Sequence, residues 1–222
     1  MNPVTESRSR IQAVVFDVGE TLVDETRAWS YEAKRAGVTP LTLFAALGAL
    51  IEQGNDHREV WALLGVEPPT RPLPLEPGDF YPDALPCLRD VAAAGLRVGI
   101  AGNQPEAAEE MLRSLDALLS LVASSSRWGV EKPSPAFFEQ VCAEMAVEPA
   151  GVAYVGDRVD NDVLPAKAAG MFAVLVRRGP WGYLGARHPE AATADLRLDD
   201  LTSLVPRILA ARWAASRRGA AT

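Results

Sequence analysis

The chain has 222 residues, a length that allows one or two domains. Its net charge of −7 argues against a general nucleic-acid binder, because such proteins usually carry a basic face. Two cysteines and two histidines without spaced partners exclude a disulfide framework and disfavour a histidine metal site. The sequence shows neither a long apolar segment nor a signal-peptide pattern, so we expect a cytoplasmic protein that binds no membrane.

The first predicted elements are a strand and a block of helices. Residues 11–16 are an apolar run that predicts a buried strand, and this run ends at Asp17. Helices are predicted over residues 26–37, 41–53 and 58–65. The second has Phe44, Leu47 and Ile51 at helical spacing, with Leu43 and Leu50 widening the apolar stripe. A proline-rich link over residues 67–74 closes the block. This pattern indicates a small helical insertion after the first strand.

Strands and helices alternate from residue 81 onward. The strands are predicted at residues 97–101, 121–123, 152–155 and 172–176. The helices between them begin near residues 83, 108 and 134, with a short one ending at 170, and Ser134 is a candidate cap. Residues 177–182 are predicted as a loop, and a last helix is predicted from residue 199 to about 214. Strands separated by helices predict an α/β fold with a doubly wound, Rossmann-like parallel sheet.

Polar residues follow several of the predicted strands. Because the carboxyl ends of neighbouring parallel strands converge, we expect these residues in one crevice. Carboxylates gathered there repel one another unless a cation lies among them, and Mg²⁺ prefers such oxygen ligands. A single lysine among them suits an anion, so the pattern predicts metal-assisted chemistry on a phosphate-like substrate. The residues are Asp17, the pair Gly102-Asn103, Lys132, and Asp157 with Asp160, Asn161 and Asp162.

Four segments in this order resemble the motifs of the haloacid dehalogenase (HAD) superfamily of phosphohydrolases, and the resemblance covers nearly the whole chain. It implies a Rossmann-like core over residues 1–23 and 76–222, with a small type 1 helical cap (C1 type) over residues 24–75. The segments are Phe16-Asp17-Val18-Gly19-Glu20-Thr21-Leu22, Gly99-Ile100-Ala101-Gly102-Asn103, Gly129-Val130-Glu131-Lys132-Pro133 and Gly156-Asp157-Arg158-Val159-Asp160-Asn161-Asp162.

The resemblance implies a role for each acidic residue and for the lysine. Asp17 would be the nucleophile that takes the phosphoryl group as an aspartyl-phosphate, and also a ligand of Mg²⁺. The backbone carbonyl of Gly19 and the carboxylate of Asp157 would be further ligands. Asp162 would bind the metal through water or orient the site. Lys132 would hold both Asp17 and the phosphate.

Two positions depart from the usual phosphatase pattern. Gly19 stands where a second aspartate normally protonates the leaving group and then activates water, a role worth about two to four decades in rate. Gly102 replaces the serine or threonine of the second motif. Thr21 and Asn103 are expected to bind phosphate beside Gly102 and Lys132, Asn103 as an amide donor in place of the missing hydroxyl. Glu20 adjoins Gly19, but neighbours on an extended strand point to opposite faces.

The leading interpretation is a Mg²⁺-dependent phosphohydrolase acting on a small phosphorylated metabolite. The alternative is a non-catalytic or weakly active relative that binds Mg²⁺ and a phosphate ligand or a protein partner. A 2-haloacid dehalogenase is disfavoured, because the Gly156-Asp157 motif indicates metal use. A phosphonatase would need a buried cap lysine, and Lys34 lies in a charged patch. The sequence leaves the substrate open, and it does not decide between a monomer and a homodimer.

Overall fold

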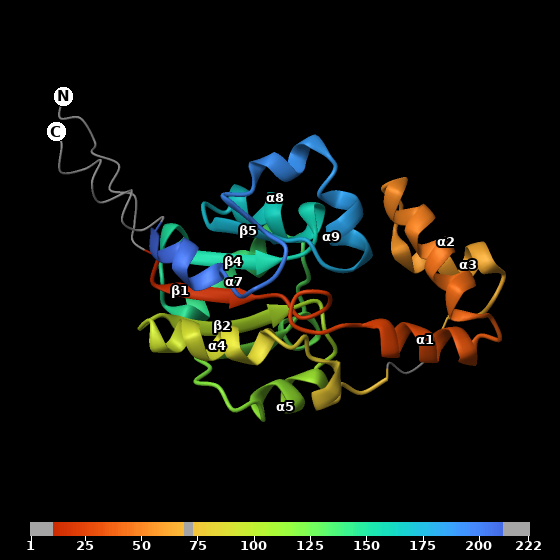
Figure 1. The fold of residues 1–222 in the computed structure, drawn as a ribbon, viewed down its shortest axis with the longest axis horizontal. Helices are drawn as coiled ribbons and strands as arrows, with labels where there is room; N and C mark the ends of the chain where they lie inside the picture. Colours follow the sequence, from red (N-terminus) through yellow and green to blue (C-terminus); the bar gives the residue numbers. More distant parts are fainter. Residues whose placement is uncertain (1–10, 69–72, 211–222) are drawn as a thin grey trace.

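The computed structural model describes residues 11–68 and 73–210, and its centre is a six-stranded parallel sheet (Figure 1). The strand order is β3-β2-β1-β4-β5-β6, so the chain winds outward in both directions from β1. This order confirms the predicted doubly wound α/β fold. The strands are β1 (Ala13–Phe16), β2 (Arg97–Gly102), β3 (Leu121–Ser124), β4 (Val152–Gly156), β5 (Phe172–Val176) and β6 (Leu196–Leu198).

Both faces of the sheet are buried, as expected for a parallel sheet covered by crossover helices. In β1, Val14 and Phe16 face one hydrophobic cluster, whereas Ala13 and Val15 face the other. Helix α4 (Ala84–Ala93) and a helix over residues 204–210 cover the first face. Helices α7 (Pro135–Met145) and α8 (Leu164–Ala168) cover the second. The two layers hold β1 rigidly, and with it the residue at which it ends.

Shorter elements connect these layers. The remaining α-helices are α1 (Thr26–Arg35), α2 (Pro40–Glu52), α3 (Val60–Leu64), α5 (Ala108–Arg113), α6 (Ser125–Trp128) and α9 (Gly179–Gly185). Single turns are η1 (His57–Glu59), η2 (Pro77–Asp79), η3 (Pro149–Gly151) and η5 (Pro189–Thr193), with a π-helical turn, η4 (Val159–Val163). Within the described residues no single helix is long and apolar enough to cross a membrane; α1 and α2 reach the threshold only together, across a 111° bend.

Helices α1, α2 and α3 form the helical insertion, which has a hydrophobic cluster of its own. Figure 1 shows it beyond the tips of the strand arrows, on the side where the strands end. Leu43, Leu47 and Leu50 of α2 are buried in this cluster. Trp181 of α9 packs against the same cluster from the core. The insertion therefore lies over the carboxyl edge of the sheet.

Several predicted elements differ from those observed. The prediction missed β6, which has only three residues, and α9, whose first part was expected to be a loop over residues 177–182. The helix predicted from residue 108 to 119 ends at Arg113, because the Ser114 hydroxyl donates to the Met111 carbonyl at 2.7 Å and closes the last turn. The last helix begins at residue 204 rather than 199, and its predicted end near 214 lies outside the described residues.

Two side-chain predictions were also wrong in detail. Helix α2 buries Leu43, Leu47 and Leu50 of the predicted apolar stripe, whereas Phe44 and Ile51 are only partly buried. The apolar residues of α2 surround much of the helix, so their spacing alone did not fix the buried side. Ser134 precedes α7 as predicted, but its side chain makes no capping hydrogen bond.

Candidate active site

Asp17 is the first residue after β1, at the centre of the carboxyl edge. Its backbone N–H donates to the carbonyl of Val155 at 2.8 Å, so the ladder to β4 continues to this residue. The residue is 7% exposed. Because β1 is buried between two layers, the sheet fixes the position of this carboxylate.

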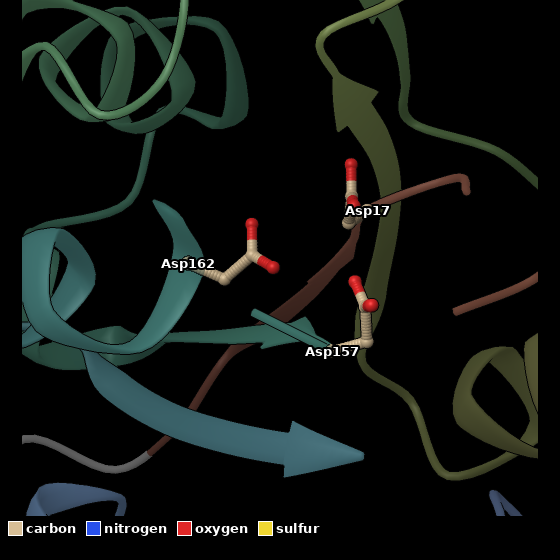
Figure 2. Close-up of side chains that lie close together, drawn as sticks. All are labelled: Asp17, Asp157 and Asp162. Atoms are coloured by element: carbon tan, nitrogen blue, oxygen red, sulfur yellow. The ribbon is translucent and has the colours of Figure 1, made fainter. Parts of the chain in front are cut away.

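Three carboxylates converge at this edge. Asp157 follows β4, and Asp162 lies in the π-helical turn after it. Figure 2 shows the carboxylates of Asp17, Asp157 and Asp162 pointing into one space, and an oxygen of each lies within 4.8 Å of the others. The backbone N–H of Arg158 donates to Asp162 Oδ2 at 2.9 Å, which orients that side chain. The sequence predicted this convergence from the ends of parallel strands.

Lys132 joins the cluster from the loop before α7. Its Nζ lies 2.6 Å from Asp17 Oδ1 and 2.6 Å from Asp162 Oδ1. Burial alone would lower the pKa of Lys132, but the carboxylates of Asp162 and Asp17 raise it well above its ordinary value. The lysine is therefore charged and bound to two of the three acids.

One lysine does not neutralise three buried carboxylates. Burial and the negative charges of Asp162 and Asp17 raise the pKa of Asp157 well above its ordinary value. Burial also raises the pKa of Asp162, to about 6, although Lys132 opposes the shift. Asp157 Oδ2 is buried without a hydrogen-bond partner. A divalent cation with oxygen ligands would satisfy both the charge and this atom, so the donor set fits Mg²⁺.

Two glycines allow side chains to approach closely. A Cβ at Gly102, the last residue of β2, would lie 2.3 Å from Asp17 Oδ1, so a serine or threonine there would require Asp17 to move. A Cβ at Gly19 would lie 2.6 Å from Oε1 of Glu25. At both positions that depart from the phosphatase pattern, a neighbouring carboxylate therefore occupies the space that a side chain would need.

Asn103 and Thr21 are the other residues predicted to bind phosphate. The Asn103 side-chain amide donates to the carbonyl of Lys132 at 3.0 Å, and its Oδ1 accepts from the Lys132 N–H at 2.8 Å. Asn103 thus holds the Lys132 backbone and has one amide hydrogen left. Thr21 is fully buried, and its hydroxyl has no hydrogen-bond partner. Asp160 is exposed and pairs with the guanidinium of Arg158 at 2.6 Å.

Two residues beside the site were not singled out by sequence patterns. Glu25 immediately precedes α1, and its pKa is raised to about 7, mainly by burial and then by the charge of Glu20, with a contribution from Asp17. Tyr81 donates its hydroxyl to Glu20 Oε2 at 2.6 Å. An acidic residue at a helix start is common for the helix dipole alone, so no sequence signal marks Glu25.

The carboxylate of Glu20 binds groups outside the three-carboxylate cluster, and the Glu20 backbone differs from the extended form expected from the sequence. Its backbone is not extended, because its φ is +52°. The side chain binds Tyr81 and the N–H of Glu25, the latter at 3.0 Å. Its carboxylate is therefore already used in joining the turn to the start of α1.

A cleft of about 350 Å³ lies between the helical insertion and the core. Glu25, Trp29 and Trp61 line it from the insertion side, and Gln104 lines it just after Asn103. The indole rings of Trp29 and Trp61 are stacked with centroids 6.3 Å apart. The volume lies in the range of pockets for small molecules.

The fold is Rossmann-like, and the acidic centre lies at the carboxyl edge of its sheet. Residues 11–170 match the family model described as haloacid dehalogenase-like hydrolase, and the chain belongs to this family. This confirms the family and the hydrolase class predicted from the four motifs.

The chain is similar to phosphatases along most of its length. It is 28% identical over 213 residues to a glyceraldehyde 3-phosphate phosphatase of Methanopyrus kandleri, covering 81% of this chain and 90% of that protein. It is 29% identical over 221 residues to a phosphoglycolate phosphatase of Rhodospirillum rubrum, covering 87% and 89%. The crystal structure of a HAD phosphatase from Thermococcus onnurineus aligns with a TM-score of 0.58 at 22% identity, covering 87% and 96%, which shows the shared fold.

Proposed function

We propose that this protein is a Mg²⁺-dependent phosphatase that hydrolyses a small phosphorylated metabolite through an aspartyl-phosphate on Asp17. The observation that carries the proposal is the Lys132 ammonium, 2.6 Å from both Asp17 and Asp162, beside the unpaired buried oxygen of Asp157. The phosphatases among its relatives support the same activity.

The position of each core residue suggests its role in the proposed reaction. Asp17 is held at the strand end, where its carboxylate can attack phosphorus. Lys132 restrains that carboxylate and attracts the substrate phosphate, and Asn103 positions Lys132 through its backbone. Gly102 lets the backbone of β2 lie against Asp17. Thr21, whose buried hydroxyl has no hydrogen-bond partner, would be a further phosphate-binding residue.

Asp17, Asp157 and the Gly19 carbonyl would hold Mg²⁺, with Asp162 acting through water. Mg²⁺ supplies charge neutralisation, which lets an anionic nucleophile meet an anionic phosphate. Within the cluster, Asp162 also orients Lys132, through the bond to its Nζ. Because all three acids are buried, their electrostatic interactions with Lys132 and with a bound cation would be stronger than in water.

We further propose that residues 24–75 act as the cap and that residues 1–23 and 76–222 form the catalytic core. The separate hydrophobic cluster of the helical insertion supports this division. The cleft beneath it suits a metabolite of small size. Lys34 is exposed on α1, which does not suit a Schiff-base lysine.

The test is phosphate release from sugar phosphates, phosphoglycolate, glyceraldehyde 3-phosphate and an aryl phosphate, with Mg²⁺ and with EDTA. We expect Mg²⁺-dependent turnover that Asp17→Asn abolishes. Asp160→Asn is the matched control, because Asp160 lies in the same loop as Asp157 and Asp162 but is exposed and pairs with Arg158. Turnover that survives in Asp17→Asn would refute the proposed nucleophile. No turnover on any compound would favour the non-catalytic interpretation.

A further inference from the structure

The space that a side chain at position 19 would occupy is filled by the carboxylate of Glu25. A Cβ at Gly19 would lie 2.6 Å from Glu25 Oε1 and 3.2 Å from Oε2. Position 19 is two residues after Asp17, and in the usual phosphatase pattern an aspartate stands there. A carboxylate is thus present where the pattern expects one, but it comes from six residues further along the chain.

The structure holds Glu25 in this place from two sides. Its backbone N–H donates to Glu20 Oε1 at 3.0 Å, which fixes the turn into α1. The indole N–H of Trp29, one helical turn later, donates to Glu25 Oε2 at 3.2 Å. Within the described part of the chain, Oε1 accepts no hydrogen bond. One oxygen is therefore anchored, and the other faces Gly19 and is available.

Glu25 also meets the cleft from which a substrate would approach. It lines the space between the insertion and the core together with Trp29 and Gln104. A phosphate at Asp17 would place its leaving group toward that cleft, because the buried sheet closes the opposite side. The neighbouring acid, Glu20, is already bound by Tyr81 and by the Glu25 N–H.

We propose that Glu25 transfers the proton that an aspartate at position 19 would otherwise transfer. The inference rests on the phosphatase activity proposed above. In the first step an Asp17 oxygen bonds to phosphorus, the bond from phosphorus to the leaving oxygen breaks, and Glu25 gives its proton to that oxygen. In the second step Glu25 takes a proton from water, the water oxygen bonds to phosphorus, and the bond to Asp17 breaks. Phosphate leaves, and both carboxyl groups return to their starting forms.

The first test is Glu25→Gln, which keeps an acceptor for Trp29 but cannot transfer the proton. With an alkyl phosphate, whose leaving group needs a proton, we expect kcat to fall by about two to four decades. Nitrophenolate leaves without a proton. With a nitrophenyl phosphate the first turnover of Glu25→Gln should therefore persist, as a burst of about one nitrophenolate per active site, followed by slow hydrolysis of the phosphoenzyme. Glu59→Gln, an exposed acid of the insertion, is the matched control and should behave as wild type.

The second test moves the carboxylate back to position 19. Gly19→Asp alone should impair the enzyme, because its Cβ would collide with Glu25. In a Glu25→Ala background the same change has room, and we expect it to restore at least about one decade of the lost alkyl phosphate turnover. A rescue confined to the alkyl phosphate, with an unchanged melting temperature, is not expected of a residue that only stabilises α1.

The outcomes separate this inference from the proposed function. Wild-type turnover that Asp17→Asn abolishes, together with Glu25→Gln within about threefold of wild type on the alkyl phosphate, would overturn the role of Glu25 alone. An equal loss on alkyl and aryl phosphates, with no burst, would also overturn it. A wild-type protein without any turnover would overturn both the proposed phosphatase activity and the proposed role of Glu25. Thermal melting of each variant shows whether it is folded.

Discussion

The core side and the insertion side of the candidate site hold their acids differently. Asp157 and Asp162 are at most 2% exposed and lie beside a lysine fixed by several contacts. Glu25 is only partly buried, and a single indole N–H anchors its side chain. The core thus gives rigid positions to the groups that meet phosphate, while the insertion carries a group at the boundary of the cleft. If Glu25 has the proposed role, the insertion supplies the carboxylate that the first motif lacks at Gly19, and the core positions are unchanged.

Among changes on the core side, Lys132→Met is expected to cause the largest loss of stability. It leaves three buried carboxylates without their cation, so we expect the free energy of unfolding in EDTA to fall by about 3–5 kcal/mol. Urea unfolding measures the loss. The control is Lys167→Met, whose ammonium pairs with Asp195 at 2.8 Å near the surface and should contribute about 1 kcal/mol or less. Equal losses of unfolding free energy in the two variants would show that Lys132 stabilises the buried carboxylates no more than a surface ion pair does.

The same cluster should make the metal-free protein less stable as the pH rises. The pKa of Asp162 is about 6 in the folded protein against 3.8 for the ordinary group, and the pKa of Asp157 is also raised. The folded state then binds protons that the unfolded state releases, so stability is lost between about pH 4 and pH 6 for Asp162, by up to about 3 kcal/mol. Urea unfolding in EDTA across this range measures the slope.

Two controls sharpen the pH experiment. Mg²⁺ should flatten the slope, because it binds the ionised carboxylates. Asp162→Asn should reduce the slope in EDTA, because one of the two titrating carboxyl groups is gone. A metal-free protein whose stability rises from pH 4 to pH 6 would contradict the prediction.

A smaller effect is expected where the insertion contacts the core. Trp181 of α9 packs edge-on against His57 of the insertion, with centroids 5.4 Å apart. Trp181→Ala removes a ring contact worth about 0.5–1.5 kcal/mol. We therefore expect KM for the best substrate to rise by up to about tenfold, with kcat changed less. Tyr183→Ala, an exposed ring on the same helix, is the control. A fall in kcat alone would show that the contact does not position the insertion.

Much of the core could be predicted because its signals are local. The apolar runs before Asp17 and Asp157 are long enough to identify buried strands, and the rule that parallel strands converge brought these acids together. The elements that were missed lack such signals. Strand β6 has three residues, and α9 forms in a glycine-rich stretch because Trp181 packs against the insertion and Gly182 lies against the backbone of Arg177.

The sequence by itself determined the α/β class, the family and the set of acids with Lys132, since these depend on periodicity and on residue types at strand ends. Only the tertiary structure decided what stands opposite Gly19. The direction of the chain after the turn depends on the backbone of Glu20, with φ of +52°, and on its bonds to Tyr81 and the Glu25 N–H. These contacts bring Glu25 back against Gly19. Contacts between residues on different elements depend on how the elements pack, and no local pattern records that packing.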